Sequence, residues 1–387
     1  MYLYMGHMTF DHLKPYEDWF WEKNRIYRLR DYVEGIDTDA GTVACASGKR
    51  FSYDRLIIAT GSKTRYRGWP GQNLLGVQGM YNVQDIQCME QFTRGIDRGV
   101  IVGDGLIGVE MVEMLRSRNI GVTLLGRHRW YWGSVLPPEE GALIGRELEE
   151  HGVDFRPETE LREIRANEAG RVGNIVTSRG EIIDCGFVGI ATGVAPNIDV
   201  VFNTGIEHDR GVLVDEYFRT SVPNVYAAGD CAQFREPLPG RKPVEQVWYS
   251  ARAHGETLSS TVCGDPQPYR PGLWFNSAKF FDIEYQTYGT VPVRPSRDEE
   301  TFYWEHPDGK KCIRINYEKE SGAVIGFNAF GVRLRQKMCE EWINKKTGIS
   351  TVATSMHKAV FDPEFFPGYA RLIAAEWNNC EHKREAG

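Results

Sequence analysis

A glycine-rich turn between two apolar runs constrains the fold of this chain more than any other feature. The first run, at 99–102, leads directly into Gly103, Gly105 and Gly108, which are spaced as GxGxxG. A stretch with helical periodicity follows at 109–118, and then a second apolar run. A strand, a helix and a second strand in this order form a βαβ unit, which requires a parallel sheet with both faces covered.

The three glycines have separate physical roles when such a turn binds a dinucleotide. Gly103 allows the tight turn, Gly105 lets the backbone approach a pyrophosphate, and Gly108 lets the helix pack closely against the strand. The unpaired N–H groups at the helix N-terminus then point toward the phosphates. GxGxxG alone is weak evidence because the chain contains 41 glycines, but its place between strand and helix favours a dinucleotide site over a turn that binds nothing.

The end of the second strand, Gly121–Leu125, predicts which nucleotide is preferred. An NAD site usually carries an acidic residue there, which binds the ribose hydroxyls. This chain instead has a glycine followed by Arg127, His128 and Arg129. Guanidinium groups pair with a 2′-phosphate, which a carboxylate would repel, so the sequence favours NADP. The alternative is that these cations form a solvated surface cluster and that NAD binds.

Length, charge and cysteine spacing restrict the remaining possibilities. The chain has 387 residues, 41% of them hydrophobic, which predicts two or three packed units and excludes a single small module. A net charge of −7 makes nucleic acid and anionic membranes poor partners. The 8 cysteines show no CxxC and no metal-ligand spacing with the histidines, so we expect no metal site and a cytoplasmic location. We find no targeting signal and no membrane span.

Three further apolar runs end in similar ways. The runs at 53–61 and 186–193 both end in Ala-Thr-Gly, and each predicts a strand buried on both faces. A third run at 225–230 ends in Gly-Asp and also predicts a buried strand. The other expected elements are strands at 33–44, 49–51, 153–156 and 180–184, helices at 138–151, Trp248–Val262, 334–344 and 369–377, and a hairpin of strands at 311–317 and 324–327.

These motifs, in this order, resemble those of the FAD-dependent pyridine nucleotide-disulfide oxidoreductases. The chain is most similar to the branch with ferredoxin, rubredoxin and nitrite reductase flavoproteins, over approximately residues 1–268. The resemblance implies an α/β fold with two Rossmann-like dinucleotide domains and an α+β C-terminal interface domain. The implied domains are residues 1–79 and 196–268 for FAD, 80–195 for NAD(P), and 269–387 for the interface, through which a homodimer is expected.

The resemblance also implies roles for single residues around the flavin. Thr60 and Gly61 correspond to the crossover of the flavin domain, and Asp230, after Gly229, corresponds to an aspartate that accepts a hydrogen bond from the FAD ribityl chain. A helix N-cap without a ligand is the alternative for Asp230. Trp248 belongs to a segment that passes the flavin ring in such reductases, where it could stack on the ring, or it packs in the core instead.

Two further residues are assigned to the nicotinamide end. Glu110 corresponds to a catalytic glutamate near the nicotinamide and the flavin, although an ordinary helix-surface carboxylate is the alternative. Gly193 corresponds to a glycine that lies against the bound pyridine nucleotide. The segment at 276–289 is rich in both aromatic and polar residues, so it is either a docking surface or a dimer seam, and the sequence leaves that choice open.

The chain departs from the family because it shows only one of the family's two fingerprints. We expect Met1 to enter the fold after the first βαβ unit, so that several tens of residues of the FAD domain are absent. Two functions stay open. One is an FAD-dependent oxidoreductase that passes hydride from NADPH, or NADH, to flavin and then to an unidentified acceptor, for which a small redox protein is one candidate. The other is a flavin-less NADP-binding sensor or scaffold. Nothing supports disulfide chemistry, and Cys231 is expected to be a buried small residue.

Overall fold

The computed structural model describes residues 1–361 and 368–385 of the chain. It divides into two compact units, each assembled from segments that are distant in the sequence. The first unit consists of Met1–Arg65, Tyr81–Cys88 and Gly193–Pro271. The second consists of Tyr66–Met80, Met89–Thr192 and Gly272–Gly387. The division into three domains in four segments, expected from the sequence, stays a prediction.

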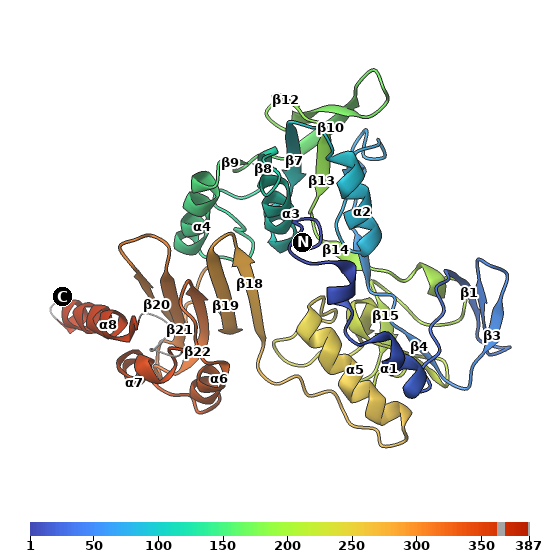
Figure 1. Cartoon of the computed structure of the whole chain (residues 1–387). Coiled ribbons are helices and arrows are strands. Elements are labelled where there is room, and N and C mark those ends of the chain that lie inside the picture. The colour runs from blue at the N-terminus through green and yellow to red at the C-terminus, as the bar shows by residue number, and fades with distance from the viewer. Residues whose placement is uncertain (362–367, 386–387) are drawn as a thin grey trace. The chain divides into compact units, whose positions relative to one another are not determined.

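The first unit is built from small sheets and one long helix (Figure 1). Its helix α5 (Trp248–Val262) has the predicted bounds. Its two parallel pairs are β4 (Leu56–Ile58) with β16 (Val225–Ala227), and β15 (Val212–Val214) with β17 (Ala232–Phe234). Its antiparallel strands are β1 (Val33–Asp37), β2 (Thr42–Cys45) and β3 (Arg50–Ser52) in one sheet, and β5 (Ser62–Thr64) with β14 (Val194–Pro196) in another. Short helical turns η1 (Phe10–Leu13) and α1 (Asp18–Lys23) come before them, and η2 (Asp199–Val201) and η3 (Gly229–Cys231) lie further along the chain.

Two strand predictions in this unit are wrong in part. The strand expected at 33–44 is a hairpin, because Asp37 Oδ1 accepts the N–H groups of Asp39 and Ala40 and Gly41 adopts a φ of +61°, which turns the chain. The run at 53–61 contains only a three-residue strand, and it is not buried on both faces. Its Ile57 side chain is 46% exposed and lines the cavity described below.

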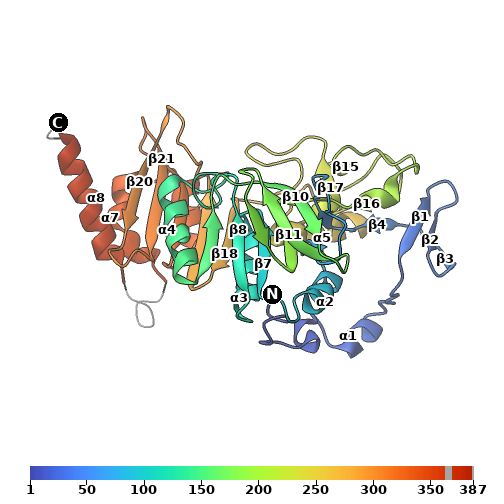
Figure 2. The same cartoon turned by 90° about the horizontal axis from the view of Figure 1, so that it is seen from above.

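The second unit contains a parallel five-stranded sheet. Its order is β6 (Val77–Gln78), β13 (Phe187–Ile190), β7 (Arg98–Val102), β8 (Gly121–Leu125) and β9 (Val153–Arg156). Two of these strands, β7 and β8, are labelled in Figure 2. Helix α3 (Leu106–Arg116) packs on β7, β8 and β13, and α4 (Pro138–Glu150) packs on β9. These pairings confirm the βαβ unit predicted around the glycine turn.

Further elements lie in this part of the sequence. Helix α2 (Val83–Phe92) precedes β7, and β10 (Leu161–Ala166), β11 (Val172–Thr177) and β12 (Ile182–Asp184) form an antiparallel sheet. Only the last of these strands was expected. The other two alternate buried and exposed positions imperfectly, because two bulges interrupt their pairing, and this weakens the period-two pattern in the sequence.

The C-terminal part of the second unit is an antiparallel sheet covered by helices. Its order is β18 (Phe275–Phe280), β19 (Ile283–Gly289), β22 (Val324–Phe330), β21 (Cys312–Glu318) and β20 (Glu299–Glu305). The helical elements are α6 (Gln336–Asn344), α7 (Ile349–Thr354), η4 (Met356–Lys358) and α8 (Ala370–Glu385). The pairing of β21 with β22 confirms the predicted hairpin. Trp342 and Trp377 are buried in the core between sheet and helices.

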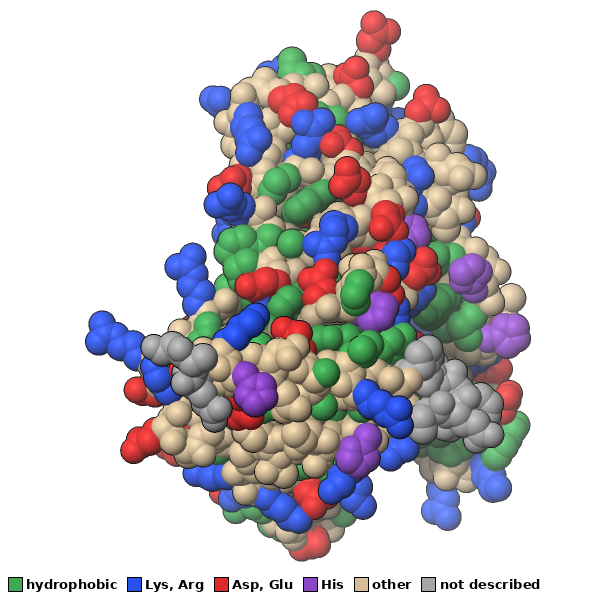
Figure 3. All heavy atoms as spheres, turned by 90° about the vertical axis from the view of Figure 1, so that its left-hand side faces the viewer, with side chains coloured by type: hydrophobic (Ala, Val, Ile, Leu, Met, Phe, Trp, Pro, Cys, Tyr) green, Lys and Arg blue, Asp and Glu red, His purple; other side chains and the backbone are tan. Residues whose placement is uncertain are grey.

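The surface carries charges of both signs. On the face shown in Figure 3, lysine and arginine side chains are interspersed with aspartate and glutamate, so this face has no extended field of one sign. Among the described helices, none has the length and apolar character needed to cross a membrane.

A buried ion pair joins α4 to the C-terminal sheet within the second unit. Arg314 Nε donates to Glu140 Oε1 at 2.9 Å, and Asn328 Nδ2 donates to Glu140 Oε2 at 2.8 Å. Arg314 also contacts Glu139, at 2.7 Å. Burial raises the pKa of Glu140 to about 7, although the charge of Arg314 and both hydrogen bonds lower it. The carboxylate is therefore tolerated only because its partners are in place.

We predict that Arg314→Met lowers the free energy of unfolding by about 3 kcal/mol at pH 8, because it leaves a buried carboxylate unpaired. The folded-state pKa of Glu140 lies above its ordinary value of 4.5, so ionising it costs stability as the pH rises from about 4.5 to about 7. The loss in Arg314→Met should therefore be smaller at pH 5 than at pH 8. Urea unfolding of the wild-type and variant proteins at both pH values measures this difference.

Glu140→Gln is the control, since it removes the titration and keeps an acceptor for Arg314. It should flatten the pH dependence of unfolding over the same window. Equal losses for Arg314→Met at pH 5 and pH 8 would contradict the assignment.

Candidate functional site

A cavity of about 640 Å³ lies in the first unit, beyond the carboxyl ends of the parallel strands β4 and β16. This is where ligands bind in open α/β sheets. The lining comes from the two strand ends and from α5, where lining residues recur every three or four positions. The lining residues are Ile57, Ala59, Gly61, Tyr81, Ala228, Gly229, Asp230, Trp248, Ala251, Gly255, Leu258 and Ser259.

A hydrogen-bonded network of polar side chains surrounds Asp230 at the cavity wall. Ser62 Oγ donates to Asp230 Oδ2 at 2.9 Å and accepts from Gln246 Nε2 at 2.8 Å. The hydroxyl of Tyr81 accepts the N–H of Ser62 at 2.7 Å and faces the same Asp230 oxygen at 3.5 Å. Burial raises the pKa of Tyr81, and the charge of Asp230 raises it further. Asp230 keeps a second carboxylate oxygen for a ligand hydroxyl.

Two glycines let the backbone form this wall. Gly61 has a φ of +69°, and a Cβ there would lie 2.4 Å from the Tyr81 hydroxyl. Gly229 has a φ of +74°, and its N–H donates to Nδ1 of the buried His254 at 3.1 Å. The hydroxyl of Thr60 instead donates to the Asn197 carbonyl, and Thr60 does not line the cavity.

A buried ionic cluster lies behind Gly229. Nε2 of His254 lies 3.6 Å from Glu245 Oε2, and Glu245 also accepts from the Tyr269 hydroxyl at 2.9 Å and pairs with Arg241 at 2.6 Å. Burial raises the pKa of Glu245, but the contacts with His254, Arg241 and Tyr269 together hold it below its ordinary value. Because His254 Nδ1 accepts a hydrogen bond, its proton is on Nε2, facing Glu245.

The glycine turn of the second unit has the close backbone contacts that its sequence predicted. Gly103 has a φ of +112°, and a Cβ there would lie 2.4 Å from the Ala191 carbonyl oxygen. A Cβ at Gly108 would lie 2.0 Å from the carbonyl oxygen of Gly103. Gly105 is the N-cap of α3, so the free N–H groups of the helix begin at this turn.

The cationic segment follows β8 at the same edge of the sheet. Arg127 and Arg129 are exposed, and neither forms a hydrogen bond or an ion pair with any residue that the structure describes. His128 is half-buried, and its Nδ1 has no hydrogen-bond partner within the described chain. Backbone bonds hold the segment, because Thr159 N–H donates to the Gly126 carbonyl and Glu158 N–H to that of His128.

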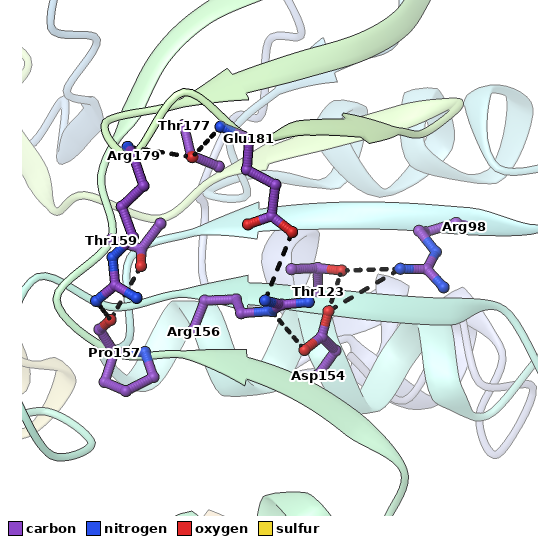
Figure 4. Close-up of polar contacts among 9 residues, drawn as sticks. All are labelled: Arg98, Thr123, Asp154, Arg156, Pro157, Thr159, Thr177, Arg179 and Glu181. Carbon is purple, nitrogen blue, oxygen red and sulfur yellow. Dashed lines mark hydrogen bonds and ion pairs between the residues drawn. The ribbon is translucent and has the colours of Figure 1, made fainter.

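The arginines drawn in Figure 4 differ from Arg127 and Arg129, because their guanidinium groups already have protein partners. Arg156 Nε donates to Asp154 Oδ1 at 2.7 Å, and Arg156 Nη1 lies 3.5 Å from Glu181 Oε1. Arg179 donates to the carbonyls of Pro157 and Glu158. Among these arginines, Arg127 and Arg129 are therefore the ones available to an anionic ligand.

The remaining predicted residues are not among those that line the cavity. Glu110 is half-buried on α3, and burial raises its pKa. Gly193 has a φ of +96°, and its carbonyl accepts the N–H of Arg65. Cys231 is buried, as expected, and burial raises the pKa of its thiol. One acidic group not foreseen in the sequence, Glu147 with His151 and Asp282, has ligand atoms within 4.8 Å of one another, but the Lys310 ammonium also contacts Glu147.

Residues 17–255 match the family described as pyridine nucleotide-disulphide oxidoreductase. The chain belongs to this family. The family and the two-dinucleotide-domain fold predicted from the sequence are thereby confirmed.

Curated relatives point to the same branch. Rhodocoxin reductase of Rhodococcus erythropolis is 30% identical over 250 residues, which cover 64% of this chain and 58% of that protein. Rubredoxin-NAD(+) reductase of Ectopseudomonas oleovorans is 27% identical over 264 residues, or 68% of each chain. The NAD(P)H nitrite reductase of Bacillus subtilis strain 168 is 26% identical over 361 residues, which cover 91% of this chain and 44% of that protein. The chain thus spans about half to two thirds of the length of these relatives.

A solved structure shows the same fold. The NAD-dependent persulfide reductase from A. fulgidus superimposes with a TM-score of 0.83 at 22% identity, covering 100% of this chain and 76% of that one. At that identity the likeness concerns the fold alone.

We predict that Gly108→Ala lowers the free energy of unfolding by about 3 kcal/mol, since the added methyl group would overlap the Gly103 carbonyl and move α3 away from β7. Gly145→Ala is the matched control. It lies within α4, where a Cβ would meet nothing within 4 Å, so it should stabilise the protein by about 0.5–1 kcal/mol. Denaturant unfolding distinguishes the two variants, and similar effects would contradict the close contact.

Proposed function

We propose that the protein is an FAD-dependent NAD(P)H oxidoreductase that passes hydride from NADPH, or NADH, to flavin and electrons onward to a small redox protein. The observation that carries this proposal is the cavity at the carboxyl ends of β4 and β16, in a chain that also has a dinucleotide turn in its second unit. The names of the relatives, reductases of rubredoxin and of other electron carriers, support the choice of acceptor. Homodimerisation through residues 269–387 stays a prediction.

The residues of the cavity fit a flavin nucleotide. The small side chains at both strand ends leave room for a flat ring or an extended chain to lie close to the backbone. The Asp230 carboxylate offers an acceptor to ligand hydroxyls, and the Ser62 hydroxyl holds one of its two oxygens. Trp248 is 65% exposed and is one of the residues that line the cavity, where its indole ring would stack on a heterocycle. Bound FAD would supply the ring that accepts hydride.

The chain's own residues would orient the cofactors. His254 holds the Gly229 N–H, which fixes the turn that carries Asp230. At the second site, the N-terminus of α3 would bind the pyrophosphate, and Arg127, His128 and Arg129 would bind a 2′-phosphate. Glu110, on the same helix, and Gly193 remain our candidates for the nicotinamide end, and Thr60 would shape the wall indirectly through its bond to the segment at 197.

We predict that the purified chain binds FAD and shows a flavin absorption band, and that anaerobic NADPH bleaches it because hydride passes to the ring. Absorption spectra after incubation with FAD and removal of excess cofactor measure both steps. Asp230→Ala should weaken FAD binding, whereas Asp209→Ala, an exposed carboxylate of the same unit, should not. A chain that binds NADPH but no FAD would instead support a flavin-less sensor or scaffold.

A second prediction concerns the nucleotide. Arg127→Glu with His128→Ala should lower the affinity for NADPH at least about tenfold more than that for NADH, because the 2′-phosphate loses charged donors. Arg162→Glu makes the same charge change at an exposed position on β10 and should spare both affinities. Equilibrium titrations with each nucleotide provide the comparison. Equal losses for the two nucleotides would refute the NADP preference.

A further inference from the structure

A carboxylate lies at the end of β8, although Gly126, the residue directly after this strand, has no side chain. Gly126 follows Leu125, and a Cβ built on Gly126 would lie 2.9 Å from Oδ2 of Asp104. Asp104 is the residue between the first two glycines of the turn, so its side chain crosses from the end of β7 to the end of β8. Both strands belong to the second unit and pair in parallel, which brings their carboxyl ends to one edge.

We propose that Asp104 is a nucleotide-specificity residue, which supplies from the glycine turn the carboxylate that NAD sites carry at the end of the second strand. This inference rests on the proposed function, because it deepens the account of the same nucleotide site. The carboxylate would accept bonds from the ribose hydroxyls of NADH and repel the 2′-phosphate of NADPH.

The surroundings of Asp104 keep its carboxylate in place. Its side chain is largely buried, with the residue 8% exposed, and Oδ2 accepts the N–H of Trp132 at 3.0 Å. Burial raises the pKa of Asp104, whereas its own backbone N–H, that of Trp132, and the charges of His128 and Arg127 lower it. Arg127 and His128 are therefore near enough to Asp104 for charge on them to act on its carboxylate.

Opposite charges at one edge have opposite effects on the two nucleotides. Arg127 and His128 attract a 2′-phosphate, and Asp104 disfavours it while favouring free hydroxyls. Any repulsion between Asp104 and the pyrophosphate is common to NADH and NADPH and cancels in the ratio of their affinities. The ratio is therefore the quantity that reports the role of this carboxylate.

A purely structural role for Asp104 makes a different prediction. The bond to Trp132 holds the segment that follows Arg127, and losing it would disturb binding of both nucleotides alike. Asp104→Asn separates the two roles, because asparagine has the same size and keeps an oxygen acceptor for Trp132 but removes the charge. Asp104→Ala removes both the charge and the acceptor.

The test is an equilibrium titration of the full chain with NADPH and with NADH, followed by tryptophan fluorescence or calorimetry, neither of which requires turnover or flavin. Asp104→Asn should shift the affinity ratio at least about tenfold toward NADPH, through tighter NADPH binding and weaker NADH binding. Asp154→Asn is the matched control. It removes the same charge from β9, where Asp154 pairs with Arg156 and lies 4.0 Å from Arg98 (Figure 4), and it should leave the ratio unchanged.

Three results would overturn the inference. An unchanged ratio in Asp104→Asn, with Asp104→Ala weakening both nucleotides equally, would make Asp104 a structural anchor for Trp132. A shift of the same size in Asp154→Asn would show that net charge, rather than position, sets the ratio. A wild-type chain that binds neither nucleotide would refute the proposed function itself, and this result is distinct from the other two because it appears before any variant is made.

Discussion

The contact of backbone with backbone at the glycine turn determines the layout of the nucleotide edge in the second unit. Because no side chain separates Gly108 from Gly103, α3 begins directly against the end of β7. Parallel pairing then brings the end of β8 alongside, and the N–H of Gly103 donates to the Leu125 carbonyl. The helix N-terminus, the cationic segment and the Asp104 carboxylate share one edge for this reason.

The cavity of the first unit also lies where the carboxyl ends of parallel strands meet, but its side chains have a different character. Two parallel strand ends, at Ala59 and Ala228, again meet at one edge, and glycines again follow them. Here no cation is among the residues that line the cavity. Asp230 is held by hydroxyl and phenol groups, and His254 supports the turn from behind. An edge of this kind suits a ligand with hydroxyl groups and a flat ring better than it suits an additional phosphate.

The sequence predicted those parts of the fold that short-range patterns determine. Gly121–Leu125 and Trp248–Val262 have the expected bounds, because each has an unbroken periodicity and clear ends. It failed where an apolar residue faces a cavity, as Ile57 does, since a hydrophobic side chain gives the same signal whether it lines a cavity or packs in a core. Ser62, Tyr81 and Gln246 could not be found in advance, because only the folded chain brings them to Asp230.

The proposed role of Asp104 also could not be predicted from the sequence. The free-energy cost of burying its carboxylate shows why the charge itself matters. The N–H of Trp132 would be satisfied by an asparagine at this position, without the desolvation cost of a buried carboxylate. Part of that cost is offset by the N-terminus of α3, whose N-cap Gly105 is the next residue, and part by Arg127 and His128. A charge kept where a neutral side chain would serve the structure is best explained by what it does to a ligand, and at this edge the ligand differs between NADH and NADPH by one phosphate.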